Sequence, residues 1–566
     1  MHSRVDRFPW LLLTVLLALL LGLPTLATAA MVGNPACAGE DVLFNPGNGE
    51  DIVVPSGFRV EVFAKGLNFP TAVAFRGNAK RFEVFVLESG HGLPSRCNNE
   101  TLAVFGGEFS LTNPFTPDIL VFNESGTLIR GPLAKPTAPG VGLQPHGPTI
   151  DIAFEKGFEG GRLFATDSNA AIRAVGGGNN SSRIVTVDPH TGQVTPFITE
   201  LPTGDHPAEQ ITFKGGFIYW SQGSTTNAGV VGHDNGGGAN QPDIPCQDIV
   251  LSSNLFNSGD GHLTSGYSLH GVDNRGKTIN AFTGARHLGV CDGAILRARL
   301  DARHPEDTIE PFSWGYRNPF GIRFAPDDHA LKGGLFVTEN GEDERGARPT
   351  NNAPDRLHLA QMNLDGTPDY HGWPDRFGFL DSTQLVFDPV GGPGDDCVPC
   401  SKGNPVKPVL AFPPQPITAP LAIEPADVAI VGLDFVPNSF VHGPVKRGAA
   451  LAGREGDFGF SKSNGTPEEG HDIQLINFSR PGEPLQLQLQ RFAHNTTFEQ
   501  AFPAGLRGIN RPVDLKFGPD GCAYLVDYGA VRDFGQSDPA SRFTNLADAP
   551  LVQIPGTGVI WKICRD

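Results

Sequence analysis

After its first thirty residues the chain has no long hydrophobic run, and throughout it has fewer basic than acidic residues. Lys and Arg number 43 against 61 Asp and Glu, so the formal net charge is −18. An acidic chain is not expected to bind nucleic acid or an anionic membrane surface. The lack of a second long apolar run predicts that the chain after these residues carries no integral membrane anchor. The expected partners are neutral small molecules or cations.

The first thirty residues predict a signal peptide, residues 1–30. A basic start precedes the apolar run Leu11–Leu23, and Ala27-Thr28-Ala29 has the small-x-small pattern of a signal-peptidase site. A membrane anchor is the alternative, but the run is short for a bilayer span and Pro24 follows it. The protein is therefore expected to be secreted or periplasmic.

Several common catalytic motifs are missing. We find no Gly-rich phosphate loop, no Gly-x-Ser-x-Gly, no His-Glu-x-x-His and no EF-hand pattern. Their absence counts against nucleotide enzymes, α/β-hydrolases and common zinc proteases. The stretch "CVPC" has no second ligand pair with zinc-finger spacing, and no histidine follows it to complete a c-type haem motif.

All eight cysteines follow the predicted leader, and an even number in an oxidising compartment indicates disulfides. Eight cysteines allow 105 pairings. We predict that Cys397 bonds to Cys400 across a tight loop and that Cys522 bonds to Cys564 across two strands of a closing blade. Proximity in sequence predicts the other two pairs, Cys37 with Cys97 and Cys246 with Cys291.

The chain has no convincing long amphipathic helix, and its 71 Gly and 49 Pro residues favour short strands joined by tight turns. A unit of strand, turn and strand recurs six times. Its copies begin at Pro70, Gly147, Ala208, Asn318, Val428 and Arg511. Repeats of this kind predict an all-β fold, a six-bladed β-propeller that spans residues 31–566 as a single domain. Two separate β-sandwiches are the structural alternative.

The copies are irregularly spaced, so long loops are expected between blades. A bare four-stranded blade needs about forty to fifty residues, and several spacings here exceed that length. We expect inserts from Ser224 to about Gly293 and in the stretch that begins at Asp388, both of which contain cysteines.

Polar residues stand just before the first strand of four copies. Because the first strand of each blade lines the central channel, these residues are expected to meet at one channel mouth. Taken singly, each is better read as an ordinary loop residue, and only the shared placement in four copies makes a functional role an equal alternative. They are His146, the pair Asp205 and His206, the pair Arg317 and Asn318, and Arg511.

The loop Thr338–Gly346 is rich in oxygen ligands, since it contains Glu339, Glu342, Asp343 and Glu344. Carboxylates and backbone carbonyls are the ligands that Ca²⁺ prefers. From composition alone, a solvated acidic turn explains this loop better than a calcium site does.

Four stretches taken in order resemble a known family. "SWGYRNPFGIRFAP", "LFVTENGEDERG", "PDRLHLA" and "DYHGWP" resemble segments of the soluble quinoprotein glucose/sorbosone dehydrogenases, and "RPVDLKFGPDGCAYLVDYG" resembles their closing blade. The resemblance is specific between Arg317 and Pro374 and looser elsewhere. It implies a propeller that binds pyrroloquinoline quinone (PQQ) and Ca²⁺ in the channel mouth and passes electrons from a sugar to an external acceptor.

The resemblance also implies roles for individual residues. It identifies His206 as the general base with Asp205 beside it, and the carbonyls of Gly341 and Glu342 as calcium ligands. It places His146, Arg317, Asn318, Arg511 and, with a less certain match, Arg454 against the cofactor. Three departures stand out: His146 where Gln is typical, Glu342 in place of Pro, and "DRLH", with Arg356, in place of Asp-Glu-Ile-Asn.

The chemistry can be read from the residues as well. Taking a hydride from a C–H bond requires that the hydroxyl on that carbon lose its proton, and His is the side chain best suited to accept it near neutral pH. Ca²⁺ and an Arg stabilise negative charge that develops on a quinone oxygen. Two other functions remain open at this point: a Ca²⁺-dependent propeller hydrolase such as a lactonase, and a non-catalytic propeller that binds a partner.

Overall fold

The structure is a computed structural model, and it describes the chain in thirteen stretches. They are residues 30–34, 37–90, 115–169, 180–232, 241–258, 261–282, 290–343, 346–350, 352–377, 405–414, 419–457, 469–533 and 551–566.

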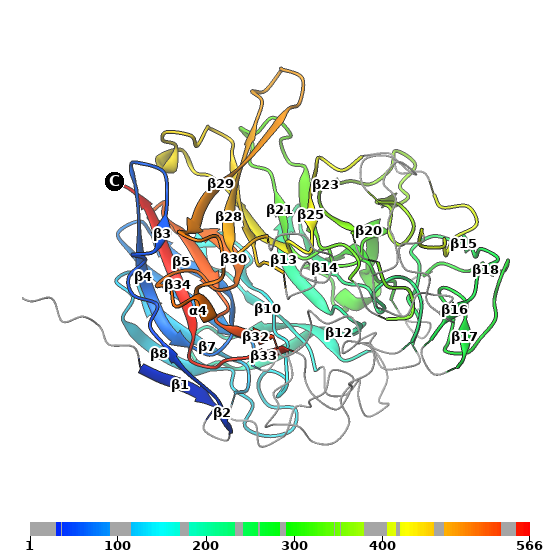
Figure 1. The fold of residues 1–566 in the computed structure, drawn as a ribbon, viewed down its shortest axis with the longest axis horizontal. Coiled ribbons are helices and arrows are strands. Elements are labelled where there is room, and N and C mark those ends of the chain that lie inside the picture. The colour runs from blue at the N-terminus through cyan, green and yellow to red at the C-terminus, as the bar shows by residue number, and fades with distance from the viewer. Residues whose placement is uncertain are drawn as a thin grey trace, which may run out of the picture.

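Six antiparallel sheets form the blades of a propeller (Figure 1). From the innermost strand outward, the first blade has β5 (Pro70–Asn78), β6 (Arg81–Glu88), β7 (Asp118–Asn123) and β8 (Leu128–Leu133). The second has β9 (Ile152–Phe154), β10 (Leu163–Asp167), β11 (Ser182–Val187) and β12 (Val194–Leu201). The third has β13 (Ala208–Lys214), β14 (Phe217–Gln222), β19 (Ala294–Arg299) and β20 (Glu310–Trp314), to which β24 (Asp369–Tyr370) adds in parallel.

The fourth blade has β21 (Ile322–Phe324), β22 (Leu335–Glu339), β23 (Pro354–Ala360) and β25 (Ala422–Ala426). The fifth has β26 (Ile430–Phe435), β27 (Ala450–Arg454), β28 (Asp472–Phe478), β29 (Leu487–Asn495) and β3 (Ile52–Val53). The sixth has β30 (Pro512–Phe517), β31 (Ala523–Asp527), β34 (Gly558–Arg565) and β4 (Phe58–Leu67). The six inner strands β5, β9, β13, β21, β26 and β30 contact one another in a ring.

The remaining elements are short. They are β1 (Ala30–Asn34), β2 (Cys37–Phe44), β15 (Ile249–Val250), β16 (Phe256–Asn257), β17 (Leu263–Thr264), β18 (Thr278–Ile279), β32 (Val531–Asp533), β33 (Leu551–Gln553), the helix α4 (Ala501–Ala504) and three 3₁₀ turns, Gly157–Glu159, Pro305–Thr308 and Asn438–Phe440. Within the described stretches, no helix has the length and apolar character needed to span a membrane. The predicted leader lies outside the described residues apart from Ala30, the first residue of β1.

The predicted propeller is confirmed, because each of the six repeated units forms the two innermost strands of one blade. The second strands β10, β22, β27 and β31 are buried at every residue, since neighbouring blades cover both of their faces. Such strands read as nearly continuous apolar runs. The outer strands are less buried: β12 exposes Thr195, Pro196 and Glu200, and β29 exposes Gln488 and Arg491. This contrast is why the inner halves of the blades are the easier halves to find in the sequence.

The predicted insert after Ser224 is also present, between β14 and β19 of the third blade. It contains two small two-stranded sheets, β15 with β18 and β16 with β17, which lie at the side of the propeller opposite β4 and β34 in Figure 1. Most of the insert expected around Asp388 falls in residues 378–404, outside the described stretches.

The ring closes through two strands from opposite ends of the chain. β4 pairs along its whole length with β34, and Figure 1 shows these strands, blue and red, side by side. The amide of Asp566 donates a hydrogen bond to the carbonyl of Gly57 at 3.0 Å. The last blade therefore cannot form until both ends of the chain are in place.

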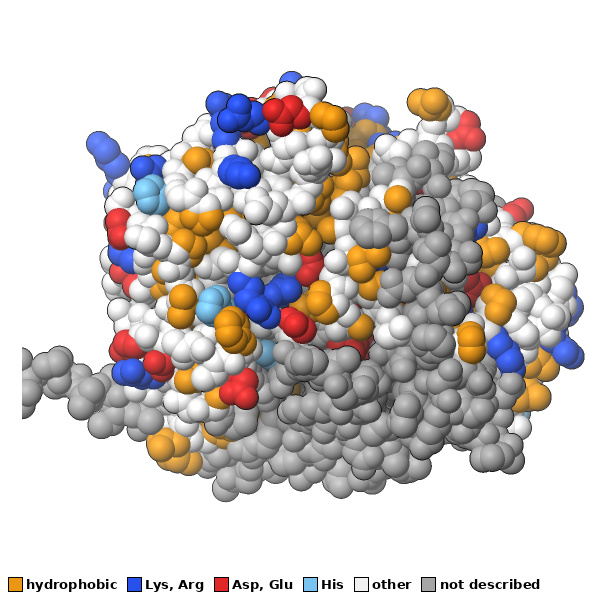
Figure 2. All heavy atoms as spheres, turned by 45° about the horizontal axis from the view of Figure 1, so that its top comes forward, with side chains coloured by type: hydrophobic (Ala, Val, Ile, Leu, Met, Phe, Trp, Pro, Cys, Tyr) orange, Lys and Arg blue, Asp and Glu red, His pale blue; other side chains and the backbone are white. Residues whose placement is uncertain are grey.

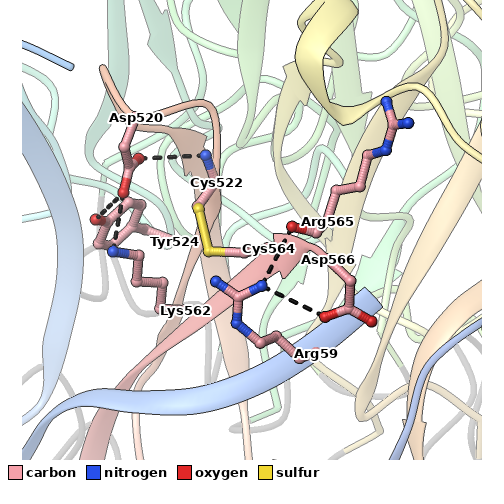
Figure 3. Close-up of a disulfide and its surroundings, with 8 residues drawn as sticks. All are labelled: Arg59, Asp520, Cys522, Tyr524, Lys562, Cys564, Arg565 and Asp566. Carbon is pink, nitrogen blue, oxygen red and sulfur yellow. Dashed lines mark hydrogen bonds and ion pairs between the residues drawn. A yellow bond between two sulfur atoms is a disulfide. The ribbon is translucent and has the colours of Figure 1, made fainter. Parts of the chain in front are cut away.

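A disulfide reinforces this closing blade (Figure 3). Cys522, just before β31, bonds to Cys564 in β34, as predicted. Asp520 accepts hydrogen bonds from the amide of Cys522 at 3.2 Å and the hydroxyl of Tyr524 at 3.0 Å, and lies 2.9 Å from Nζ of Lys562. The predicted Cys246–Cys291 disulfide is present too. The other two predicted pairs involve Cys97, Cys397 and Cys400, which lie outside the described residues.

Replacing both Cys522 and Cys564 with Ser should destabilise the protein. The bond closes a chain segment with a sequence separation of 42 residues, and a crosslink of this span contributes about 2 to 4 kcal/mol. We expect a lower midpoint of urea unfolding for the double variant, with the native circular-dichroism spectrum retained. Under reducing conditions the double variant and the wild type should unfold together. A double variant that unfolds at the wild-type midpoint without reductant would show that the bond adds nothing.

Charged side chains fill the channel axis below its mouth. Nζ of Lys516, in β30, lies 2.5 Å from Oδ1 of Asp151 and 3.3 Å from Oδ2 of Asp514. Nε2 of Gln210, in β13, donates to Oδ1 of Asp514 at 2.9 Å. All four side chains are buried. This network links three blades at the axis. Lys516 balances the charge of the two buried aspartates, and Gln210 is hydrogen-bonded to one of them.

On the outer surface, charges of both signs are mixed. Figure 2 shows Lys and Arg side chains lying among Asp and Glu side chains on the described part of the visible face. Exposed pairs such as Arg447 with Asp328, at 3.1 Å, are part of this pattern. Such pairs contribute little to stability.

Candidate active site

A cavity of about 270 Å³ opens where the six inner strands begin. Every blade contributes to its wall at or just before its innermost strand, through Thr71, Ile150, Glu209, Phe320, Ala429 and Val513. The cavity therefore lies on the propeller axis. It is the channel mouth at which the predicted polar residues were expected to meet.

Irregularities in strand pairing direct three of these side chains. The register shifts between Pro70 and Ala72, between Ala208 and Ile211, and between Pro512 and Asp514. Thr71, Glu209 and Val513 lie within these shifts and line the cavity. A bulge leaves a residue unpaired and turns its side chain, which is how a regular sheet aims side chains at a site.

A second device fixes the loops that precede the inner strands. In four blades the last residue of the second strand is a buried carboxylate that accepts a hydrogen bond from a backbone amide of the loop leading to the inner strand. The pairs are Glu88 with Asn68 at 2.5 Å, Asp167 with Gln144 at 3.0 Å, Glu339 with Arg317 at 2.9 Å, and Asp527 with Arg511 at 2.8 Å. Buried amides need such partners, so the loops are held in one conformation.

The residues predicted as the catalytic centre do lie together in the cavity wall. Nδ1 of His206 is 3.4 Å from Oδ2 of Asp205, and the same oxygen is 3.5 Å from Nη2 of Arg317. The Asp205 side chain is almost completely buried, while about a fifth of the His206 side chain is exposed. A carboxylate beside Nδ1 favours the tautomer with hydrogen on Nδ1, which leaves Nε2 as the basic nitrogen.

Arg317 is held by oxygen atoms. Its guanidinium donates to the carbonyl of Gly341 at 2.7 Å and to a carboxylate oxygen of Asp343. Next to it, the side-chain Nδ2 of Asn318 donates to Oδ1 of Asn340 at 2.9 Å. Three oxygen-bearing residues, Gly341, Asp343 and Asp205, thus surround one cationic group at the edge of the cavity.

Six carboxyl groups line the cavity: Asp205, Glu209, Asp343, Asp355, Asp427 and Glu455. Burial raises the pKa of Asp355 to about 7 and that of Glu455 to about 7. Burial also raises the pKa of Glu209 well above its usual range, although Arg317 opposes the shift. Near neutral pH these three groups therefore carry protons part or all of the time, and a protonated carboxyl can donate a hydrogen bond to a ligand.

Two of the departures from the family pattern prove to be partners. Nη2 of Arg356 lies 3.6 Å from Oε2 of Glu342, and Nε of Arg356 lies 3.2 Å from Oε2 of Glu339. All three side chains are buried. Burial raises the pKa of Glu342 to about 7 against the opposing effect of Arg356. The arginine in "DRLH" thus supplies the counter-charge that the additional glutamate in the acidic loop requires.

Glu342, His146, Arg454 and Arg511 do not line the cavity, although all four are buried. The guanidinium of Arg454 binds both oxygens of Asp472, at 2.7 and 2.5 Å, and lies 3.3 Å from Glu424. Arg511 donates to the carbonyls of Gly456 and Asp457, at 2.6 and 2.9 Å. The carbonyl of Glu342 accepts the hydroxyl of Thr350 at 3.0 Å.

Sequence reasoning missed several residues of the wall, among them Glu209, Asp355, Asp427, Glu455 and Tyr528. Asp427 precedes the fifth inner strand and satisfies the same positional rule that identified Asp205 and Arg317. Glu209 follows His206 by three residues, inside a strand that reads as apolar. Asp355 lies in the third strand of its blade, where the sequence gives no signal of a channel residue.

The chain shows distant structural likeness to several solved proteins. No protein-family model and no curated protein sequence matches the chain. The calcium structure of a Trichoderma reesei carbohydrate-active enzyme of family AA12 aligns over 91% of this chain and 97% of its own, with 15% identity and a TM-score of 0.48. The apo form of the soluble aldose sugar dehydrogenase of Escherichia coli aligns over 90% and 100%, with 14% identity and a TM-score of 0.45. A periplasmic gluconolactonase of Pseudomonas aeruginosa aligns over 88% of both chains, with 9% identity and a TM-score of 0.30.

Both dehydrogenases and lactonases thus occur among the solved structures that this chain resembles. At these TM-scores the likeness carries no argument, and the fold and the site rest on the sheet topology and the contacts given above.

Proposed function

We propose that the protein is an exported enzyme that oxidises a sugar in the channel mouth, with PQQ and Ca²⁺ as cofactors and an external electron acceptor. The single observation that carries the proposal is the arrangement of His206, Asp205 and Arg317 in the wall of the axial cavity. Export is supported by the predicted leader and by two disulfides, which persist in oxidising compartments.

The oxygen atoms at the edge of the cavity fit a calcium ion in kind. Gly341 offers a carbonyl, and Asp343 and Asp205 offer carboxylates; in this structure the cation that they surround is the Arg317 guanidinium. Among the described residues, no group of three or more His, Cys, Asp and Glu side chains is arranged to hold a metal ion. A bound Ca²⁺ would therefore depend on the backbone carbonyl as well as on Asp343 and Asp205.

The cavity also offers groups that suit a flat, acidic quinone. Pro148, Ile150, Phe320, Val513 and Tyr528 supply apolar and aromatic surface for a ring system. Arg317 and Asn318 would hold its carboxylates. Of the three arginines expected for this task only Arg317 lines the cavity, so we expect the quinone to be held with fewer cations than the family resemblance implies.

When bound, the quinone would supply the acceptor for the hydride that leaves the sugar carbon. The chain itself would supply the base. With hydrogen on Nδ1 facing Asp205, Nε2 of His206 can take the proton of the sugar hydroxyl, and the negative Asp205 stabilises the imidazolium that results. Asp205 is itself tied to Arg317, so the base is held at a fixed place in the wall.

A lactonase is the second candidate, and the acidic wall is the observation that favours it. The cavity has six carboxyl groups and one arginine, and three of those carboxyls have raised pKa values. A neutral, hydroxyl-rich ring can accept hydrogen bonds from protonated carboxyls without adding negative charge. In this case His206 would take a proton from water that attacks the lactone carbonyl.

One set of assays separates the candidates. The protein stripped of cofactors is given Ca²⁺ alone or Ca²⁺ with quinone, and its visible spectrum, dye reduction with a panel of aldoses and hydrolysis of sugar lactones are recorded. Dye reduction only with quinone supports the dehydrogenase, whereas lactone hydrolysis without quinone supports the lactonase. If neither reaction occurs in a protein that shows the bound quinone spectrum, the proposed enzyme function is wrong.

Calcium should stabilise the protein through the loop that contains Gly341 and Asp343. A ligand that binds only the folded state at a hundredfold excess over Kd adds about 2.7 kcal/mol to the free energy of unfolding. We expect a higher melting temperature in calcium than in chelator, and the difference should be largely lost in Asp343→Asn. A melting temperature that does not respond to chelator would rule out a calcium site here.

A further inference from the structure

The third blade lacks the carboxylate that fixes the corresponding loop in four other blades. At the end of β14 stands Gln222, whose side-chain Nε2 donates to the carbonyl of Pro202 at 2.9 Å. The amides of Asp205 and His206 instead donate to the carbonyls of Thr225 and Ser224, at 3.0 and 3.1 Å. The candidate base is therefore held by the segment that directly follows β14.

That segment also holds Arg317. The amide of Ser224 donates to the carbonyl of Arg317 at 2.8 Å, and the amide of Gly223 donates to the carbonyl of Pro207 at 3.0 Å. Residues 223–226 thus touch the backbone on both sides of the site. Whatever fixes these four residues fixes the distance between His206 and Arg317.

Two buried carboxyl groups from the insert bind this segment from its other side. Oδ1 of Asp243 accepts the amides of Thr225 and Thr226, at 2.8 and 3.0 Å, and its Oδ2 accepts the Thr226 hydroxyl at 2.5 Å. Oδ2 of Asp292 accepts the hydroxyl of Thr225 and also its amide, the latter at 3.2 Å. Oδ1 of Asp292 accepts the amide of Ile244 at 3.0 Å, which connects the two carboxyl-bearing stretches.

The Cys246–Cys291 disulfide fixes these two stretches as well. Cys291 directly precedes Asp292, and Cys246 lies three residues after Asp243. Both carboxyl groups are buried. Burial raises the pKa of each, and in Asp292 the neighbouring Asp243 adds to the shift, so the pair retains a proton near neutral pH.

We propose that Asp243 and Asp292 are positioning residues for the active site: through Thr225 and Thr226 they fix the backbone that holds His206 and Arg317. This inference rests on the proposed function of His206 as the base. It assigns to the insert of the third blade the task that a carboxylate at the end of the second strand performs in four other blades.

Asp292→Ala is the decisive change, and Asp292→Asn is its conservative partner. Asn keeps the oxygen that accepts the Ile244 amide, and the Thr225 hydroxyl can rotate to accept a hydrogen bond from the new amide. The backbone amide of Thr225 loses its 3.2 Å contact with Asp292 but keeps its shorter bond to Asp243. Asp167→Ala is the matched control, because it also removes a fully buried carboxylate, one whose partners Gln144 and Arg183 lie in the second blade.

The first readout does not require turnover. The ring resonances of His206 are followed by NMR across pH in histidine-labelled protein and assigned by their loss in His206→Gln. Asp292→Ala should shift the chemical shifts and titration of His206, Asp292→Asn should restore them, and Asp167→Ala should leave them as in the wild type. If the Asp292→Ala protein is folded and as stable as the wild type, and its His206 titration is unchanged, the proposal is wrong.

The second readout is kinetic. Asp292→Ala should lower kcat by up to about 10²-fold with little change in KM, since a shift of the base by about 1 Å has this effect. If Asp292→Ala does not fold, Thr225→Val takes its place, because it removes only the hydroxyl bond and should shift the His206 titration in the same direction. An unchanged titration in Thr225→Val would then overturn the proposal. If no form of the protein turns over, the proposed function fails, and the His206 titration still decides whether Asp292 positions the ring.

Discussion

His206→Gln should keep the fold and the quinone spectrum of the protein and lose about 10² to 10⁴ in turnover, the range that a general base supplies. Glutamine retains much of the volume and one hydrogen-bond donor of the histidine, but it has no basic nitrogen. The side chain stands in the cavity wall beside Asp205, and its backbone is tied to Ser224 at 3.1 Å. The substitution therefore removes the proton acceptor and little else.

Turnover of the wild type should also decline toward acid pH, because a protonated imidazole cannot accept the substrate proton. His304→Gln is the matched control. Nδ1 of His304 lies 3.9 Å from Glu306, so this histidine also has an acidic neighbour, but its side chain is 62% exposed and remote from the cavity wall. If the His206→Gln protein that has bound the quinone and Ca²⁺ shows near-normal turnover in steady-state dye reduction, His206 is not the general base.

Lys516→Met should lower the free energy of unfolding by about 3 to 5 kcal/mol, because it leaves two buried carboxylates without their cation. Nζ of Lys516 lies 2.5 Å from Asp151 and 3.3 Å from Asp514 on the propeller axis. Methionine fills similar space, so the loss reflects charge rather than a cavity. Denaturant unfolding at neutral pH would measure it, with Lys80→Met, at an exposed lysine, as the control.

The pH dependence of this loss has a defined sign. Burial raises the pKa of Asp514, and Lys516 now opposes that shift. Without the lysine the pKa in the folded state moves further above its unfolded value. At a pH below the pKa of Asp514 in the unfolded chain, this carboxyl is protonated in both states and its burial costs the variant little. As the pH rises through the higher pKa of the folded state, the buried carboxyl must ionise and the free energy of unfolding falls. The deficit of Lys516→Met should therefore be smaller at pH 5 than at pH 8, and an equal deficit at both would contradict the role given to Lys516.

The fold was predictable because its signal is local. Each inner pair of strands is a short apolar run, a tight turn and a second apolar run, and both runs are buried between neighbouring blades. Asp205, His206, Arg317 and Asn318 were predictable for a related reason: they directly precede inner strands, and the ring of inner strands brings such positions to one mouth.

The rest of the site depends on contacts that a local pattern does not contain. Arg454 and Glu455 are adjacent, yet Glu455 lines the cavity while Arg454 binds Asp472 from the neighbouring strand. Successive side chains in an extended chain point to opposite sides. An error of one residue in matching this stretch to the family therefore puts an arginine in the cavity wall where the structure has a glutamate. Arg511 was placed correctly before its strand, but carbonyls of residues 456 and 457 hold its guanidinium.

Because β4 pairs with β34, the fold of the propeller does not depend on the blade in which the chain begins. The backbone of Asp566 is bonded to that of Gly57, so the two ends of the ring meet. A peptide linking these ends would turn the six blades into a continuous loop of chain, and the break that every linear polypeptide needs could then lie in another connection. A circularly permuted gene would thus encode at least four strands of each of the six blades, with the same channel mouth, from a different first residue.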